Sequence, residues 1–324
     1  MTVAAPPVSA AVAVDSLGEG LVRRPVTAPA AVPRTRGAVL RDYLALTKPR
    51  IIVLLEVTAL MAMVMAARGW PGTGLTLATL AGGALAAGGA NAINMWFDRD
   101  IDRTMARTCS RPIPSGRIGA GAALAFGAGL GVASFTLLTL AVNLLSAVLA
   151  VSALLFYVGV YTMWLKRSSI QNIVIGGAAG AVPPLVGVAA VTGRLDLLAV
   201  YLFAIVFFWT PPHFWALALL MRGDYQRAGV PMLPVVRGSS FTRASILQYT
   251  VLMVVVTLMP VLAQQLGAVY AAGALLLDAV FVAGAVRVVR TGSTRAAAHL
   301  FHYSLLYLAL LFAAGAADRV IGAL

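Results

Sequence analysis

Three oxygen-bearing side chains recur at four-residue intervals in the segment 94–117, NMWFDRDIDRTMARTCSRPIPSGR. In a helix, Asn94, Asp98 and Asp102 would share one face, because each step of four residues turns the helix by only about 40° beyond a full turn. Asp100 would point away from them. Two carboxylates and an amide oxygen on one face form a set of hard oxygen ligands that suits Mg²⁺, which also binds water and phosphate.

Arginines follow or interleave with these acids and would suit an anionic group held beside the metal, since guanidinium groups bind phosphate through paired hydrogen bonds. They are Arg99, Arg103, Arg107, Arg111 and Arg117. The pattern therefore predicts a magnesium-diphosphate site. A solvated charged loop between two apolar segments is the alternative. The aligned carboxylates and the proline-rich turn at 112–116 favour the site.

A second charged stretch, residues 221–243, follows the sixth apolar segment much as the first motif follows the second segment. This parallel suggests an internal duplication. Asp224 would then supply a carboxylate to the same metal, or to a second one, from the facing half of the protein, and Arg222 and Arg227 would meet phosphate. A solvated loop acid is the alternative interpretation.

A third element, residues 161–167 (YTMWLKR), places Tyr161 and Lys166 near the same surface. Lys166 would pair with a phosphate oxygen as a point charge. The same lysine would serve equally as a basic anchor at the membrane surface. This element therefore supports the site only together with the other two stretches.

The composition excludes a water-soluble globular protein. Apolar residues make up 60% of the 324-residue chain and charged residues 11%, which is typical of a polytopic membrane protein. The net charge of +13 does not indicate nucleic-acid binding, because the basic residues lie in short segments between apolar runs and no nucleic-acid motif accompanies them. The single cysteine, Cys109, excludes an internal disulfide, and no Cys or His cluster has zinc-ligand spacing.

Nine apolar segments are long enough to cross a bilayer, which takes about 20 residues. They lie near 51–67, 76–97, 119–140, 143–163, 171–191, 197–219, 244–264, 268–289 and 298–317. The N-terminal region and the longer loops hold 21 of the 24 Lys and Arg residues, and only Arg68, Arg194 and Arg319 fall on the other side. Since basic loops stay in the cytoplasm, we expect the N-terminus and the aspartate cluster on the cytoplasmic side of the cell (inner) membrane, and the C-terminus outside.

The expected fold is therefore all-α, a single bundle of about nine transmembrane helices with a polar site that faces the cytoplasm. Residues 1–40 are rich in Ala, Val and Pro and predict a disordered cytoplasmic tail; a transit peptide is the alternative. The segment 41–50 (RDYLALTKPR) predicts an amphipathic segment that leads into the first apolar segment and ends at the membrane interface around Pro49. Residues 41–324 would form the transmembrane domain.

Over residues 40–317 the chain resembles the intramembrane aromatic prenyltransferase superfamily. The superfamily's first motif, NxxxDxxxD, is matched by Asn94, Asp98 and Asp102. The stretches MARTCSRPIPSGR, TPPHFWALAL and DYQRAGVPMLPVV are similar to the branch whose acceptor is haem. Many members carry a second DxxxD, but here Asp224 is followed four residues later by Ala228. This departure is similar to the haem branch and leaves the ligands of a second metal open.

The resemblance implies an Mg²⁺-dependent prenyltransferase. It implies that farnesyl diphosphate enters from the lipid bilayer, that a vinyl group of haem B attacks the allylic cation, and that water captures the resulting cation, giving haem O and pyrophosphate. The implied protein partners are a haem A synthase or a terminal-oxidase assembly.

The site residues expected from the motifs and the resemblance fall into two groups. The catalytic and metal-binding residues would be Asn94, Asp98, Asp102 and Asp224. The diphosphate-binding residues would be Arg107, Arg111, Arg117, Lys166, Tyr161 and Arg227.

Three of the ionisable residues inside apolar segments are candidates for a polar role within the bundle. His213, in TPPHFW, would bind haem as an axial iron ligand, with a hydrogen-bonded structural histidine as the alternative. Glu56 and Asp278 would form either polar contacts to substrate or hydrogen bonds between helices, and we favour the second role.

Other functions remain open at this point. An ion-coupled secondary transporter also has many helices and buried acids, but it would place those acids at mid-membrane rather than at a helix end beside arginines. A second rival is a prenyltransferase that acts on an aromatic quinone precursor. A structural assembly factor would not need aligned carboxylates.

Overall fold

The computed structural model describes residues 35–322, and over this range the chain forms helices without any strand. The helices are α1 (Arg36–Thr47), α2 (Pro49–Ala67), α3 (Thr73–Phe97), α4 (Arg99–Thr104), α5 (Ala120–Ala141), α6 (Leu144–Leu155), the π-helix η1 (Phe156–Leu165), α7 (Lys166–Ser168), α8 (Asn172–Gly180), α9 (Val182–Thr192), α10 (Leu197–Leu220), α11 (Arg222–Arg227), α12 (Leu233–Val236), α13 (Gly238–Leu262), α14 (Ala268–Thr291) and α15 (Thr294–Ile321).

Within the described range, nine helical stretches are long and apolar enough to span a membrane. Seven of them are single helices. The other two are composite: Leu144–Ser168 joins α6, η1 and α7, and Asn172–Thr192 joins α8 and α9. The predicted all-α bundle with nine membrane spans is confirmed.

The N-terminal lead-in differs from the prediction at both ends. Helix α1 begins at Arg36 rather than at residue 41, capped by the side chain of Thr35. Pro49 does not close this helix; it is the first residue of α2, a position that suits proline because the missing N–H has no partner there anyway. Lys48 joins the two helices in the left-handed region, with φ 54°. The predicted tail falls largely on residues 1–34, outside the described residues.

Local sequence signals explain where the spans begin and end. The side chains of Asn143, Asp196 and Ser293 accept hydrogen bonds from backbone N–H groups in the first turns of α6, α10 and α15. Gly193 and Gly292 end α9 and α14 in the left-handed region, with φ of 68° and 60°, a conformation that glycine adopts without strain. These short, well-capped breaks make neighbouring spans antiparallel.

Small residues let several helices approach closely. Helix α3 packs against α5, where Gly89 and Gly127 face each other; a methyl group on Gly89 would lie 2.7 Å from the Gly127 carbonyl oxygen. Helix α2 packs against α9, where Gly187 lies against the backbone of Ala59. Close backbone approach at small residues is typical of helix packing in membranes.

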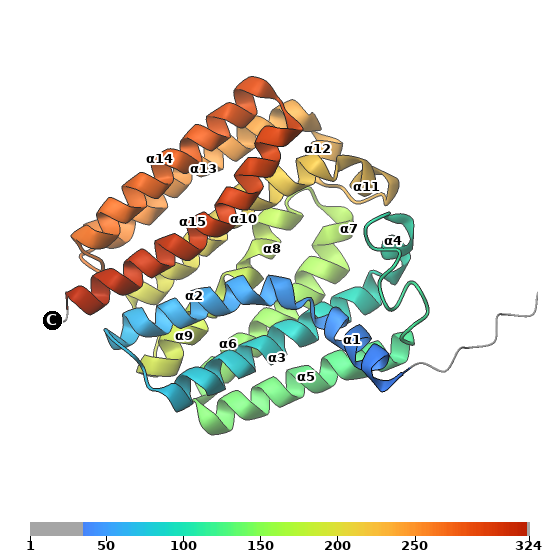
Figure 1. Ribbon diagram of the computed structural model, residues 1–324, viewed down its shortest axis with the longest axis horizontal. Coiled ribbons are helices and arrows are strands. Elements are labelled where there is room, and N and C mark those ends of the chain that lie inside the picture. Colours follow the sequence, from blue (N-terminus) through green and yellow to red (C-terminus); the bar gives the residue numbers. More distant parts are fainter. Residues whose placement is uncertain (1–34, 323–324) are drawn as a thin grey trace, which may run out of the picture.

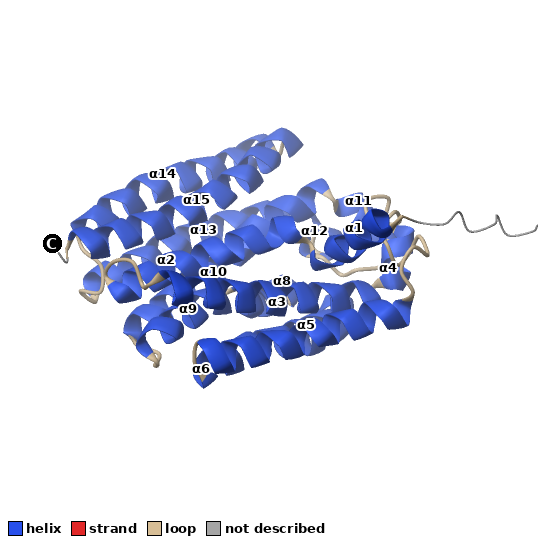
Figure 2. Ribbon diagram, turned by 60° about the horizontal axis from the view of Figure 1, so that its bottom comes forward, coloured by secondary structure: helices blue, strands red, loops and turns tan. Residues whose placement is uncertain are grey.

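Figures 1 and 2 show where the short helices and the C-terminus lie. Helices α1, α4 and α11 gather at one end of the bundle, which we call the motif end. The C-terminus lies at the other end, which we call the opposite end. The turn between α13 and α14 also reaches the opposite end, because Arg319 of α15 donates a hydrogen bond to Gln265.

The close contact at Gly187 gives a stability prediction. In Gly187→Ala the added methyl group would clash with the Ala59 carbonyl, which cannot shift because it belongs to the backbone of α2. We therefore expect the free energy of unfolding to fall by about 1–3 kcal/mol. Gly129→Ala is the matched control, because nothing lies within 4 Å of a methyl group there. Thermal unfolding in detergent measures both. An unchanged midpoint for Gly187→Ala would contradict the close packing of α2 and α9.

Candidate functional site at the motif end

The first motif follows one continuous helical path, although the regular helix is interrupted at Asp98. The Asp98 N–H donates to the Asn94 carbonyl at 2.9 Å, and the Asp102 N–H donates to the Asp98 carbonyl at 2.8 Å. The Asn94, Asp98 and Asp102 residues are 1–3% exposed, whereas the Asp100 side chain is 62% exposed. The three side chains therefore share a buried face, as the spacing predicts, and Asp100 points away.

Two basic side chains, one of them from a distant part of the chain, contact the two buried carboxylates. Lys166 donates to Asp98 Oδ2, and Arg111 Nη1 donates to both oxygens of Asp102 at 2.9 and 2.8 Å. Asn94 Nδ2 also donates to Asp98 Oδ2, at 2.8 Å. Two of the predicted diphosphate-binding residues, Lys166 and Arg111, therefore lie beside the predicted metal ligands.

Lys48 is a member of this cluster that the sequence analysis missed. Its Nζ donates to Asn94 Oδ1 at 2.9 Å from the turn between α1 and α2. Burial lowers the pKa of Lys48 to about 7, and the positive charges of Arg111 and Lys166 add to this effect, while the two carboxylates of the motif oppose it. The low pKa reflects first the burial of this lysine and then the neighbouring positive charges. No local sequence signal distinguishes Lys48 from a surface anchor.

Arg167 covers the outer side of the cluster. Its guanidinium donates to the two oxygens of Asp100 at 2.7 and 2.8 Å and lies 3.6 Å from Asp98 Oδ1. The hydrogen bonds from Arg167 lower the pKa of Asp100 to about 2. Asp100 therefore holds Arg167 at the edge of the site without entering it.

The donor atoms fit a magnesium ion. Asp98 Oδ1 is buried and accepts no hydrogen bond from the described residues, so it remains available as a ligand. The neighbouring donors are a second carboxylate and an amide oxygen, the hard oxygen ligands that Mg²⁺ prefers. Among residues 35–322 no three His, Cys, Asp or Glu side chains gather as a metal site. With three oxygen-bearing side chains as ligands, a six-coordinate Mg²⁺ would keep positions for phosphate or water.

The second charged stretch lies at the same end of the bundle but contributes differently from the prediction. Asp224 pairs with Arg227 of its own helix, α11, and no contact joins it to the first motif in the described structure. The neighbouring Tyr225 is buried instead. Burial raises the pKa of Tyr225, and the nearby positive charges of Arg107 and Arg111 oppose this rise. Tyr225, which the sequence analysis did not consider, is thus within electrostatic reach of the site arginines.

Two other predicted phosphate ligands engage protein groups. Arg117 Nε donates to Asp42 Oδ1 of α1 at 2.9 Å, and its Nη2 donates to the Ser110 carbonyl. Arg222 lies on α11 and makes a long contact of 3.5 Å to Ser239. These contacts hold the loops around the site.

Tyr161 lies in the π-helix η1, below the cluster. Its ring packs on Tyr157, with centroids 5.2 Å apart, and against Gly176 of α8. The wider turn of a π-helix places two tyrosines four residues apart on one side of the span; such segments often occur at functional sites. Lys166 follows directly after η1.

A cavity of about 510 Å³ runs through the bundle beneath these residues. Its walls come from α2, α3, α6, η1, α8, α9, α10 and α15 and are mostly apolar. Arg50, Asn91, Tyr157 and Tyr161 are among the polar residues that line it, and His213 lines it as well. The cavity is therefore a mostly apolar space near the charged cluster.

The ring of His213 is held by contacts at one nitrogen and on both faces. Its Nδ1 lies 2.6 Å from Ser304 Oγ, which lies 2.7 Å from the Phe301 carbonyl oxygen. With the Ser304 hydroxyl donating to that carbonyl, Nδ1–H is the donor to Ser304. The Nε2 atom then carries the lone pair, and no described residue bonds to it. The ring is held between Trp209 and Phe301, at 4.2 and 4.8 Å. Nε2 is thus a preset acceptor or metal ligand on a fixed ring.

The two other intramembrane acids have different roles. Asp278 accepts hydrogen bonds from Thr257 at 2.7 Å and Tyr307 at 2.6 Å, which joins α14 to α13 and α15 as predicted. Glu56 lines the cavity beside Gly83, and its Oε2 is buried without a hydrogen bond from the described residues. The predicted bond between helices is therefore wrong for Glu56, because glycine on α3 offers it no partner.

The chain belongs to the UbiA prenyltransferase family, whose family description matches residues 55–311. The fold and the site thus define a multi-pass integral membrane protein of a prenyltransferase family. The chain is 54% identical over 287 residues to protoheme IX farnesyltransferase of Thermus thermophilus, and 54% identical over 280 residues to the protein of that name from Symbiobacterium thermophilum.

The lengths of these relatives differ. The match covers 89% of this chain and 47% of the Thermus protein, so the chain spans about half the length of that relative. It covers 86% of this chain and 94% of the Symbiobacterium protein. A solved structure of a UbiA homolog from Archaeoglobus fulgidus bound to GPP and Mg²⁺ has the same fold, with a TM-score of 0.60, 16% identity, and coverage of 84% of this chain and 99% of that one.

Proposed function

We propose that the chain transfers the farnesyl group of farnesyl diphosphate to a vinyl group of haem B with addition of water, giving haem O and pyrophosphate. The observation that carries this proposal is the meeting of a carboxylate and lysine-arginine cluster with an apolar cavity that contains the free Nε2 of His213. The names of the relatives support farnesyl and haem as the two substrates.

Asn94, Asp98 and Asp102 would hold Mg²⁺ on their shared face, with Asp98 Oδ1 as the first available ligand. The bound metal would neutralise diphosphate oxygens and so help pyrophosphate to leave. Asp224 would join this set only by releasing Arg227, which would then be available to phosphate. Mg²⁺ in a solved structure of a family member supports the metal.

Lys48, Lys166 and Arg111 would bind the diphosphate once it enters the site. Each now donates to an oxygen of the motif, and each would turn a hydrogen bond toward a phosphate oxygen while it remains beside the motif. Charge that develops on the leaving group is stabilised best by donors already in position. Tyr161, Tyr225 and Arg107 would surround the bound diphosphate. Arg117 would act indirectly, because it holds its loop against α1.

The cavity would receive the farnesyl chain, because its walls are mostly apolar and lie near the cluster. Exclusion of bulk water would protect the allylic cation until the vinyl group attacks it. His213 Nε2 would ligate the haem iron, and the stacked ring and the bond to Ser304 would fix its direction. Haem would then approach through the side of the cavity formed by α10 and α15.

The motif end would face the cytoplasm, which the basic residues of its loops support, and the protein would lie in the cell (inner) membrane. Farnesyl diphosphate would reach the site from that side of the bilayer. The product, an apolar haem, would pass to a membrane enzyme that oxidises it further or to a terminal-oxidase assembly.

The function is tested by incubating the purified protein in detergent with haem B, farnesyl diphosphate and Mg²⁺ and weighing the extracted porphyrin. We expect a mass gain equal to a farnesyl group plus water, and no gain after chelation of the metal. Transfer of the farnesyl group to an aromatic acid but not to haem would show that the acceptor is an aromatic compound rather than haem. Unchanged haem and intact farnesyl diphosphate would overturn the proposal.

The shared face of the motif predicts a graded loss of activity. Asp98→Asn and Asp102→Asn should lower turnover by at least about a hundredfold, because each removes a charge from the proposed metal site. Asp100→Asn is the matched control from the same helix and should keep activity within about tenfold, since it acts only through Arg167. Size-exclusion profiles check folding. Equal losses in all three variants would contradict the assignment.

His213→Ala should weaken haem B binding by tenfold or more, about 1.4 kcal/mol, while farnesyl diphosphate binding changes little. The spectrum of bound haem should lose its nitrogen-ligand signature. His302→Ala is the control, because His302 is exposed on α15 and does not line the cavity. Wild-type haem affinity and spectrum in His213→Ala would exclude ligation.

A further inference from the structure

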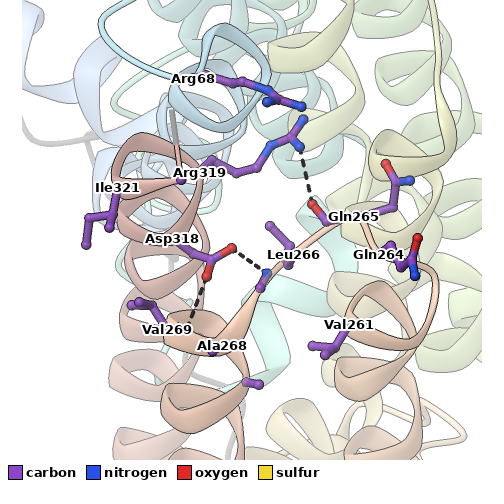
Figure 3. A pocket seen from close by; sticks show the side chains of 13 residues that line it. Arg68, Val261, Gln264, Gln265, Leu266, Ala268, Val269, Asp318, Arg319 and Ile321 are labelled. Atoms are coloured by element: carbon purple, nitrogen blue, oxygen red, sulfur yellow. Dashed lines mark hydrogen bonds between the residues drawn. The ribbon is translucent and has the colours of Figure 1, made fainter. Parts of the chain in front are cut away.

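A hollow of about 790 Å³ lies at the opposite end of the bundle, remote from the motif. It is formed by the last residue before the α2–α3 loop, the turn between α13 and α14, and the end of α15. Figure 3 shows that the side chains of Arg68 and Arg319 extend into the same region and bring their guanidinium groups near each other. Two of the three basic residues on this side of the bundle are therefore gathered in one place.

The guanidinium groups are not balanced by carboxylates in contact. Arg319 donates to the carbonyl oxygens of Met65 and Gln265, at 3.2 and 3.4 Å, and these neutral bonds leave its charge in place. Among residues 35–322, neither Arg319 nor Arg68 forms an ion pair, and the Arg68 side chain makes no hydrogen bond. Two adjacent like charges repel each other, so the arrangement favours an anion between them.

The carboxylates nearest to the hollow bind backbone N–H groups rather than the two arginines. Asp318 accepts hydrogen bonds from the backbone N–H groups of Gly267, Val269 and Tyr270, and Figure 3 shows its carboxylate turned toward this turn. Asp196 accepts from the Ala199 N–H at the start of α10. Each carboxylate therefore faces the positive end of a helix, which offsets part of its charge. The side chains of Gln264 and Gln265 add amide donors to the wall.

We propose that Arg68 and Arg319 form a binding site for a phosphate oxyanion, and that its source is the headgroup of an anionic phospholipid. Guanidinium groups suit phosphate because they offer paired donors in a plane. The apolar side chains beside the hollow indicate a lipid rather than a free ion. Val269 and Ile321 line it and are 43% and 55% exposed, and Leu262 beside it is 82% exposed. Acyl chains would lie along these residues.

The site is independent of the proposed transfer reaction. It would anchor the end of α15 to α2 and to the α13–α14 turn, because the phosphate would bridge two arginines from the first and last of the membrane spans. A lipid bound there would stabilise the closure of the bundle at the end remote from the motif.

Native mass spectrometry of the full chain, titrated in detergent with dioctanoyl phosphatidylglycerol, tests the proposal. We expect one tightly bound lipid, and dioctanoyl phosphatidylcholine should bind at least about tenfold more weakly. Arg68→Gln should lower the affinity for phosphatidylglycerol about tenfold, since it removes a charged hydrogen-bond donor. Arg68 is the residue to change, because loss of Arg319 would also break two bonds that hold the fold.

Arg194→Gln is the matched control, because Arg194 is the third basic residue on this side and does not line the hollow. It should bind phosphatidylglycerol within about twofold of the wild-type chain. Unchanged affinity in Arg68→Gln, or equal affinity of the wild-type chain for both lipids, would overturn the proposal. Displacement of the lipid by inorganic phosphate at equal concentration would support the oxyanion site and assign it to free phosphate instead.

Discussion

The site depends on the pairing of buried carboxylates with cations at the end of an apolar bundle. Asp98 and Asp102 are almost completely buried, and an isolated buried carboxylate would cost several kcal/mol. Lys166 and Arg111 offset that cost through direct hydrogen bonds. Removal of either cation would leave a buried carboxylate less compensated. The positions of α4, the loop after it and the end of η1 are therefore tied to one another by electrostatics as well as by packing.

The same pairing explains how the protein keeps a charged site next to an apolar cavity. The cations that balance the carboxylates are the ones that would bind a diphosphate, so a ligand exchanges one set of charge-assisted bonds for another. Tyr157, Tyr161, His213 and Glu56 all line the cavity. A polar head could thus bind at the cluster while an apolar tail lies in the neighbouring cavity.

The intramembrane acids illustrate two ways of placing a carboxyl group in a membrane protein. Asp278 is bonded by Thr257 and Tyr307 and joins three helices, a structural role. Glu56 has only glycine opposite it and faces the cavity. The sequence alone does not distinguish the two residues, since each is an acid within an apolar segment. The difference arises from the neighbouring helix, which supplies hydroxyl donors in one case and none in the other.

The sequence by itself determined the class of fold, the nine spans and the shared face of Asn94, Asp98 and Asp102, because these follow from segment length and from helical periodicity, both local properties. The partners of that face were decided by the tertiary structure. Lys48 reaches Asn94 across 46 residues and Lys166 reaches Asp98 across 68, and spacing along the chain carries no information at such separations. The orientation of Asp224 toward Arg227, the π-helical turn under Tyr161 and the tautomer of His213 likewise depend on neighbours that meet only in the folded bundle, since a side chain takes the direction that its three-dimensional surroundings allow.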